Sequence, residues 1–333
     1  MNSNLVDVLE RYGERAGAIG VALGAKEVGG EQAPDAVLAV AFFVGRKEPR
    51  NGGRTRLPSG RYILPRSLEV GGRRLATDVV EAESGAVPRA AARVQRAKFT
   101  AGGPVGNRME IGTFGCIVSR RGSPYPYALT NHHVGLAPNS VVAFPSYGAT
   151  GAIPAVTRAS VQLVPDEKFF PAVDRPRSYF DVDAALVQIP SPSRSRFTAR
   201  IPTIGIPDRI FQPDMASVDA YTASVVGKPV VSWCWNTRRR SGVISHVFFV
   251  TALARFAGMA VYSFLIRSAD GAMPSQKRDS GKVWVAPRPG GGVDLVGLHQ
   301  GSVNPSGSST RFAVATEVAA LARLLRISPR TAM

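Results

Sequence analysis

Cysteine and histidine are scarce in this sequence. Its 333 residues include two cysteines and four histidines. Cys116 and Cys234 both lie among apolar neighbours in strand-like segments, so we expect two free buried thiols and a reducing compartment rather than a disulfide. No Cys/His cluster accompanies the few histidines. We therefore expect no metal and no cofactor.

We expect neither a signal peptide nor a membrane span in this sequence. The first 18 residues carry several charged side chains and no apolar core of the signal-peptide type. The most apolar later stretch, residues 242–266, is interrupted by His246 and Arg255, whereas a membrane span needs about 20 mostly apolar residues without charge. We therefore expect a cytoplasmic protein with no membrane partner.

Acidic residues are few in relation to basic ones. The 24 Asp and Glu residues face 41 Lys and Arg residues, which gives a formal net charge of +17. Such an excess can indicate a polyanion-binding protein. The basic runs are short, as at Arg238-Arg239-Arg240, and no interleaved aromatic platform or nucleic-acid motif accompanies them. We expect a basic surface without a nucleic acid partner, and keep a polyanion scaffold as a hypothesis that predicts steeply salt-dependent binding.

Glycine and proline are plentiful, with 34 and 25 residues, and 44% of the chain is hydrophobic. The chain can therefore bury a sizeable core, and its many turn residues favour a mainly β fold. The spacing predicts short helices at residues 5–9 and 316–326, the second capped by Thr316. Strands are expected at residues 17–23, 36–44, 75–80, 111–118, 125–130, 141–144, 161–164, 182–189, 220–226, 230–235, 242–253, 259–266, 282–285 and 293–298.

The pattern changes along the chain divide it into two domains. Residues 1–100 are expected to form a small α+β domain and a linker rich in Ala, Arg and Gly. Residues 101–333 are expected to form the second domain. Within it, a Pro/Ser/Arg-rich connector at 191–217 separates one β block at about 105–190 from another at about 218–315. Each block could close its own sheet as a barrel and so remove its open edges.

Three local motifs could supply nucleophilic chemistry. His133 follows a strand that ends at Thr130, Asp183 opens an apolar strand, and Ser280 lies in Arg278-Asp279-Ser280-Gly281. A serine nucleophile needs a base within hydrogen-bond reach, and the base needs a carboxylate that fixes its tautomer. Histidine suits the base because its pKa lies near neutrality. The interval between Asp183 and Ser280 crosses the connector, which predicts a site between the two β blocks.

With these motifs the sequence resembles the chymotrypsin-like (trypsin-like) serine proteases, especially their bacterial intracellular members. The matching segments are Leu129-Thr130-Asn131-His132-His133-Val134, Asp183-Ala184-Ala185-Leu186, Asp279-Ser280-Gly281 and Val296-Gly297-Leu298-His299-Gln300-Gly301. The resemblance covers roughly residue 112 to the C-terminus. More weakly, segments 20–26 and 75–81 resemble the small domain that precedes the protease in some bacterial relatives.

The resemblance implies a mainly β, chymotrypsin-like double β-barrel with the small N-terminal α+β domain and a C-terminal helix. It implies a serine endopeptidase with His133, Asp183 and Ser280 as the triad, the backbone N–H groups of Arg278 and Ser280 as the oxyanion hole, and Asp279 and Gly281 shaping the loop. His132 is the alternative to His133, and Asp181 is the alternative to Asp183 because both aspartates can share one strand face. A protein or peptide is then the substrate.

The same resemblance places Pro274 at the base of the primary specificity pocket, with Ser275 and Gln300 as neighbours. Because Pro274 is not acidic, a preference for lysine or arginine is not expected. The preferred residue stays open.

Two residues depart from the family pattern. Arg278 stands where the family has glycine, and Lys282 stands where a small residue is usual. The glycine serves a backbone conformation that costs other residues about 1–2 kcal/mol. Arg278 could accept that strain, or the peptide could flip and leave the oxyanion hole unformed until a substrate or a partner binds. The alternative to an active protease is therefore a silent protease-fold scaffold, with an activating partner and self-association left open.

Overall fold

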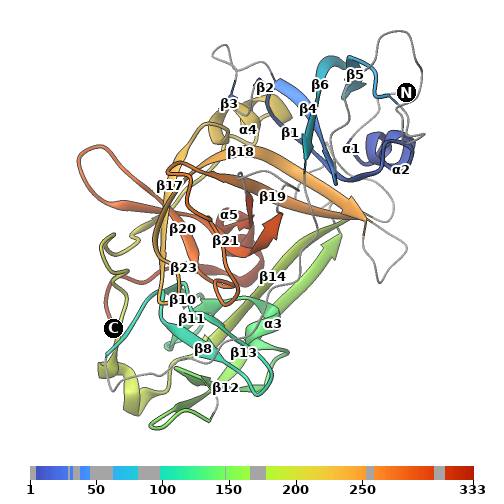
Figure 1. The fold of residues 1–333 in the computed structure, drawn as a ribbon. Coiled ribbons are helices and arrows are strands. Elements are labelled where there is room, and N and C mark those ends of the chain that lie inside the picture. Colours follow the sequence, from blue (N-terminus) through green and yellow to red (C-terminus); the bar gives the residue numbers. More distant parts are fainter. Residues whose placement is uncertain are drawn as a thin grey trace.

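The computed structural model describes residues 5–28, 31–32, 38–45, 63–81, 98–146, 148–165, 178–252, 259–303 and 312–333. Most of them are in strands, and Figure 1 shows these strands arranged in two stacked groups with the N-terminal strands beside the upper one. Within the described ranges, no helix has the length and apolar character needed to cross a membrane.

The first barrel occupies the lower part of Figure 1. Its strands are β8 (Pro104–Gly106), β9 (Ile111–Thr113), β10 (Cys116–Arg120), β11 (Pro126–Thr130), β12 (Val141–Phe144), β13 (Ile153–Pro165) and β14 (Ser178–Gln188). They pair antiparallel in the order β9-β8-β12-β13-β14-β11-β10. Because β9 leads into β10 through Phe114 and Gly115, the order closes on itself. Aromatic rings that include Phe114, Phe144 and Phe197 pack in its core.

The second barrel closes by strand pairing alone. Its strands are β17 (Pro229–Cys234), β18 (Arg238–Ala252), β19 (Met259–Ser268), β20 (Val283–Pro287), β21 (Val293–Val303) and β22 (Phe312–Glu317). Each pairs antiparallel with the next in the ring β17-β18-β19-β22-β21-β20-β17. The expected mainly β double barrel is thus confirmed.

Several strand pairings connect the two barrels to each other, to the connector and to the C-terminus. β14 pairs in parallel with β19, so one strand from each barrel lies side by side. In the connector, the 3-10 helix η3 (Ser191–Arg196) is followed by β15 (Phe197–Thr198), which pairs with β7 (Phe99–Thr100). β16 (Arg209–Ile210) pairs with β21. At the C-terminus, β23 (Ile327–Pro329) pairs back onto β10.

The N-terminal strands extend the second barrel. After the helical turns α1 (Leu5–Val8), η1 (Leu9–Gly13) and α2 (Glu14–Ala16) come β1 (Ala18–Ala25), β2 (Glu27–Val28), β3 (Glu31–Gln32), β4 (Leu38–Val44), β5 (Ser67–Val70) and β6 (Arg73–Glu81). β1 pairs with β4 on one edge and with the second half of β18 on the other, where Val21 faces Val250. A Cβ on Gly24 would lie 2.2 Å from the ring of His246, so this close approach requires glycine.

Two expectations for single elements need correction. Residues expected as a strand at 220–226 form the helix α4 (Val218–Val225), because the Ser217 hydroxyl accepts a hydrogen bond from the Ala220 N–H and caps it. The helix expected at 316–326 is α5 (Val318–Leu325), and Thr316 lies in the strand β22 instead of capping the helix. The linker expected at the end of residues 1–100 falls largely on residues 82–97, which lie outside the described ranges, and β7 begins at Phe99.

Candidate active site

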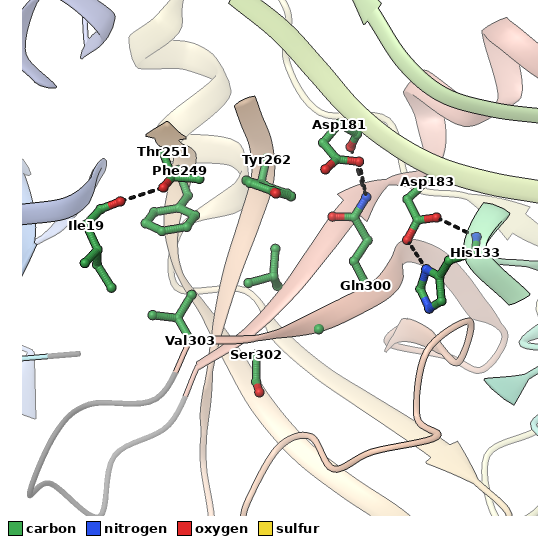
Figure 2. A pocket seen from close by; sticks show the side chains of 12 residues that line it. Ile19, His133, Asp181, Asp183, Phe249, Thr251, Tyr262, Gln300, Ser302 and Val303 are labelled. Atoms are coloured by element: carbon green, nitrogen blue, oxygen red, sulfur yellow. Dashed lines mark hydrogen bonds and ion pairs between the residues drawn. The ribbon is translucent and has the colours of Figure 1, made fainter. Parts of the chain in front are cut away.

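The structure brings His133 and Asp183 into direct contact. His133 lies in the one-turn helix α3 (His132–Gly135), which follows β11, and Asp183 lies in β14. Their side chains are 2.7 Å apart between His133 Nδ1 and Asp183 Oδ2, and the His133 backbone N–H donates to Asp183 Oδ1 at 3.1 Å (Figure 2). His133, and not His132, makes this contact. A carboxylate at Nδ1 leaves Nε2 as the ring nitrogen free to exchange a proton.

Local backbone geometry holds the pair in place. Asp183 has a positive φ of 39° inside a strand, and the β13–β14 register shifts between Val161 and Leu163, opposite this stretch. The side chain of Asn131 donates to the Asp183 carbonyl at 2.7 Å and so ties the start of α3 to β14. Strained residues that the surroundings hold in this way often mark functional sites.

The electrostatics favour a protonated imidazole more than in a free histidine. Burial of the His133 ring opposes its protonation, but the hydrogen bond and charge of Asp183 outweigh burial, so the pKa of His133 is raised above 6.5. Asp181 lies next to this pair, and burial together with the Asp183 charge raises the pKa of Asp181 to about 6. Its partners are Tyr262 and Gln300, whose amide donates to the Asp181 carbonyl at 3.0 Å.

Ser280 lies on the loop before β20, and its backbone contacts strand β9. The Thr113 N–H donates to the Ser280 carbonyl at 2.8 Å, and Gly112 fits between Ser280 and Val134. The Ser280 hydroxyl donates to the Gln300 carbonyl at 3.4 Å. Across the described ranges, no hydrogen bond joins this hydroxyl to the His133 ring. The Ser280 backbone therefore lies close to Val134, the residue after His133, and the Ser280 hydroxyl is turned toward β21.

The loop around Ser280 depends on two residues with positive φ. Gly281 has φ 92°, and a Cβ there would lie 2.1 Å from the Thr113 carbonyl, so only glycine fits. Arg278 has φ 78° and takes the conformation that usually favours glycine. Its carbonyl accepts from the Thr113 hydroxyl at 2.9 Å, and its guanidinium lies 6.0 Å from the centre of the Trp235 ring. Among the described residues, the N–H groups of Arg278 and Ser280 donate no hydrogen bond.

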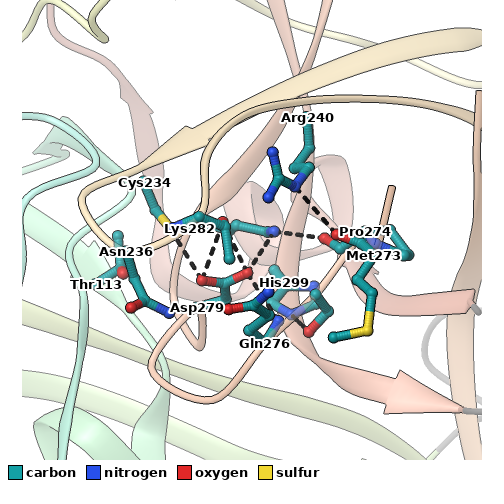
Figure 3. A network of polar contacts seen from close by, with 12 residues as sticks. Thr113, Cys234, Asn236, Arg240, Met273, Pro274, Gln276, Asp279, Lys282 and His299 are labelled. Atoms are coloured by element: carbon teal, nitrogen blue, oxygen red, sulfur yellow. Dashed lines mark hydrogen bonds and ion pairs between the residues drawn. The ribbon is translucent and has the colours of Figure 1, made fainter. Parts of the chain in front are cut away.

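A buried ion pair links two residues that flank Ser280, Asp279 and Lys282 (Figure 3). Lys282 and Asp279 are both fully buried, and Lys282 Nζ lies 2.8 Å from Asp279 Oδ2 and donates to the Pro274 carbonyl at 2.6 Å. Asp279 also accepts from the Cys234 thiol, the Thr237 hydroxyl and the Gln276 N–H. Burial opposes ionisation of Asp279, but the Lys282 charge and the hydrogen bonds that Asp279 accepts together outweigh burial and lower the pKa of Asp279. Sequence reasoning noticed Lys282 as a departure without finding its partner.

The three expected pocket residues fall into two groups. Pro274 and Ser275 are buried with the ion pair, and Ser275 Oγ lies 2.7 Å from Nε2 of His299, a residue without an assigned role in the sequence analysis. Burial and then the Lys282 charge hold the pKa of His299 well below 6.5, so this ring is neutral. Gln300 instead lines a cavity with Asp181 and Tyr262 (Figure 2).

Over the part of the chain that the structure describes, no group of three or more His, Cys, Asp or Glu residues is placed to hold a metal ion.

Comparison with known proteins finds similarity in structure only. No family model and no curated protein matches the sequence. Nocardiopsis protease is 18% identical with a TM-score of 0.45, over 71% of this chain and 100% of its own. A glutamic acid specific serine protease, described as using a histidine triad in substrate binding, is 16% identical with a TM-score of 0.47, over 69% and 100%. Thermobifida fusca protease A is 16% identical with a TM-score of 0.45, over 70% and 98%. By its own strand pairings the chain is a mainly β protein built on two barrels, and the solved structures similar to it are chymotrypsin-like serine proteases.

Proposed function

We propose that this protein is a serine endopeptidase that cleaves peptide bonds through an acyl-enzyme intermediate. The observation that carries the proposal is the His133–Asp183 pair, joined at 2.7 Å and placed beside the Ser280 loop. Ser280 is the nucleophile, His133 is the general base and acid, and Asp183 holds the imidazole in the required tautomer. Asp279 and Gly281 shape the loop.

The residues account for each proton and bond in the reaction. Ser280 Oγ bonds to the scissile carbonyl carbon while its proton moves to His133 Nε2. The resulting oxyanion accepts hydrogen bonds from the N–H groups of Arg278 and Ser280, which have no other acceptor among the described residues. The C–N bond then breaks as His133 protonates the leaving amine. Water then attacks the acyl carbonyl carbon while giving a proton to His133, and the C–Oγ bond breaks as His133 returns that proton to Ser280 Oγ.

A fluorophosphonate probe that labels activated serines tests this assignment. We expect the wild-type protein to be labelled and to cleave peptides, and both activities to be lost in Ser280→Ala and in His133→Ala. His132→Ala is the matched control, because the hydrogen bonds to the Asp183 carboxylate come from His133 and His132 Nδ1 forms none, and it should keep both activities. Labelling that persists in Ser280→Ala would contradict the proposal.

A second candidate is a protease-fold protein without turnover, and two observations favour it. The Ser280 hydroxyl donates a hydrogen bond to the Gln300 carbonyl, and Arg278 stands at the position of the oxyanion-hole glycine. Such a protein would be a scaffold, or would await an activating partner. Arg278→Gly separates the candidates if the wild type is not labelled, because labelling restored by glycine would locate the block in this loop.

The division of the chain and its location belong to the same proposal. We assign residues 1–100 to an N-terminal domain and residues 101–333 to the protease domain, supported by β8, which begins the first barrel at Pro104. A cytoplasmic location is supported by Cys116 and Cys234, which are both free.

A further inference from the structure

A cavity extends from the candidate catalytic pair to the N-terminal strands. Its volume is about 400 Å³, within the range of pockets that hold small ligands, about 300–1,000 Å³. Figure 2 shows His133, Asp183 and Asp181 at one end and apolar side chains at the other. The apolar part is formed by Ile19, Phe249, Tyr262, Val303 and Val314.

One wall of this cavity comes from outside the barrels. Ile19 belongs to β1, and its carbonyl accepts a hydrogen bond from the Thr251 hydroxyl at 2.5 Å. Ile19 packs with Tyr262 and Val303 on a hydrophobic cluster that includes Phe43 of β4 and Phe249 of β18. The N-terminal wall is therefore fixed to the second barrel by pairing and packing.

The cavity lies beside an open strand edge that starts at the nucleophile loop. β20 pairs with β21 only as far as Leu298, and the Gly281 N–H donates to the His299 carbonyl at 3.0 Å. Beyond this point, β21 continues to Val303 with β22 as its strand partner among the described residues. An extended peptide can add to such an edge as a further strand.

The direction of that strand decides which part of a substrate meets the cavity. Antiparallel pairing is the more stable arrangement, and β21 runs from the Ser280 side toward Val303. An antiparallel peptide therefore places its scissile bond near Ser280 and its preceding residues beside Gly301, Ser302 and Val303. Side chains of an extended peptide alternate between two faces, so every second one points toward the cavity.

The charges at the inner end of the cavity already have partners. Asp183 is joined to His133, and Asp181 is hydrogen-bonded by Gln300 and Tyr262. Most of the remaining lining is apolar, with Thr251 and Ser302 as uncharged polar members, and this favours an apolar side chain over a basic one.

We propose that this cavity binds an apolar side chain of the peptide substrate, two to four residues before the scissile bond, and that Ile19 makes the N-terminal domain a determinant of that specificity. The inference rests on the proposed peptidase function. It assigns to the N-terminal strands a direct contact with the substrate.

Quenched fluorescent peptides that carry leucine, alanine or arginine at each of these positions test the proposal in the full chain. We expect wild-type kcat/KM to be about tenfold higher for leucine than for alanine at one position, as is usual for a few methylene groups in an apolar pocket. Ile19→Ala should remove most of this preference while fluorophosphonate labelling stays unchanged. Leu38→Ala is the matched control, because Leu38 is a half-buried apolar residue of the neighbouring strand β4 that does not line this cavity.

The outcomes separate the two proposals. An unchanged leucine preference in Ile19→Ala, or a preference for arginine in the wild type, would overturn the inference while leaving the peptidase assignment intact. A folded wild type that neither labels nor cleaves would overturn the peptidase assignment and this inference with it. If Ile19→Ala fails to fold, Val303→Ala on the second barrel removes a different wall of the cavity and should reduce the leucine preference in the same way.

Discussion

Replacing Lys282 by methionine tests whether the buried ion pair holds the nucleophile loop. Methionine keeps the straight apolar stem but removes the ammonium group from Asp279 and from the Pro274 carbonyl. Loss of one partner from a buried pair costs about 3–5 kcal/mol, because the other charge is left uncompensated. Three further groups donate to Asp279, so we expect a loss of unfolding free energy near the lower end, about 3 kcal/mol.

This loss can be measured by urea unfolding with tryptophan fluorescence as the signal. Trp284 reports on this region, because Lys282 Nζ lies 5.0 Å from the centre of its ring. Adding Asp279→Asn to the variant removes the stranded charge and should recover part of the stability. The deficit should also shrink as the pH falls, because Asp279 without its lysine takes up a proton more readily in the folded state than in the unfolded chain.

Probe labelling of Ser280 should slow in Lys282→Met, because the loop loses the contacts of the Lys282 ammonium with Asp279 and with the Pro274 carbonyl. Lys228→Met is the matched control, as Lys228 is half-buried and its ammonium lies 4.3 Å from the centre of the Phe211 ring, away from the loop. A loss below about 1 kcal/mol, the size expected for an exposed ionic contact, together with labelling at the wild-type rate would refute the reasoning.

Three further predictions follow from buried titratable groups. Asp181→Asn removes a negative charge that helps to raise the pKa of His133, so the acid limb of the labelling rate against pH should move to lower pH. His246 is buried and neutral with a pKa of about 3, and its unfolded form gains a proton below about pH 6.5. His246→Leu should therefore reduce the slope of stability against pH between about 6.5 and 3 by about 1.4 kcal/mol per unit, measured by urea titration. Burial raises the pKa of both thiols, so a thiol reagent should find neither cysteine in the native protein and both in urea; a native reaction would contradict this.

The strands were largely predictable because their apolar residues form continuous runs bounded by turn residues. The segment 141–144 coincides with β12, and 259–266 lies within β19. The segment 220–226 was assigned wrongly because its small and β-branched residues suit a strand, whereas the Ser217 cap and the apolar positions 218, 221 and 225 determine a helix. Strand β22 was not predicted, because Thr316 was read as a helix cap.

The candidate site was predictable where short motifs carry it. The segments around His133, Asp183 and Ser280 are contiguous in sequence, so their residue types could be recognised one motif at a time. The partners of Lys282 and His299 were not predictable, because burial and not spacing brings Lys282 to the Pro274 carbonyl and His299 to Ser275. The contribution of Ile19 depends on the pairing of β1 with β18 and has no local signature.

The pairing of Val21 with Val250 also bears on how the chain reaches its native state during translation. The ribosome must add more than 200 residues after β1 before its partner strand exists, which takes roughly 10–45 s at about 5–20 residues per second. During that interval one edge of an apolar strand has no native partner, and such edges promote aggregation. Nascent chains of this protein should therefore depend on chaperones that shield the first strands until β18 emerges.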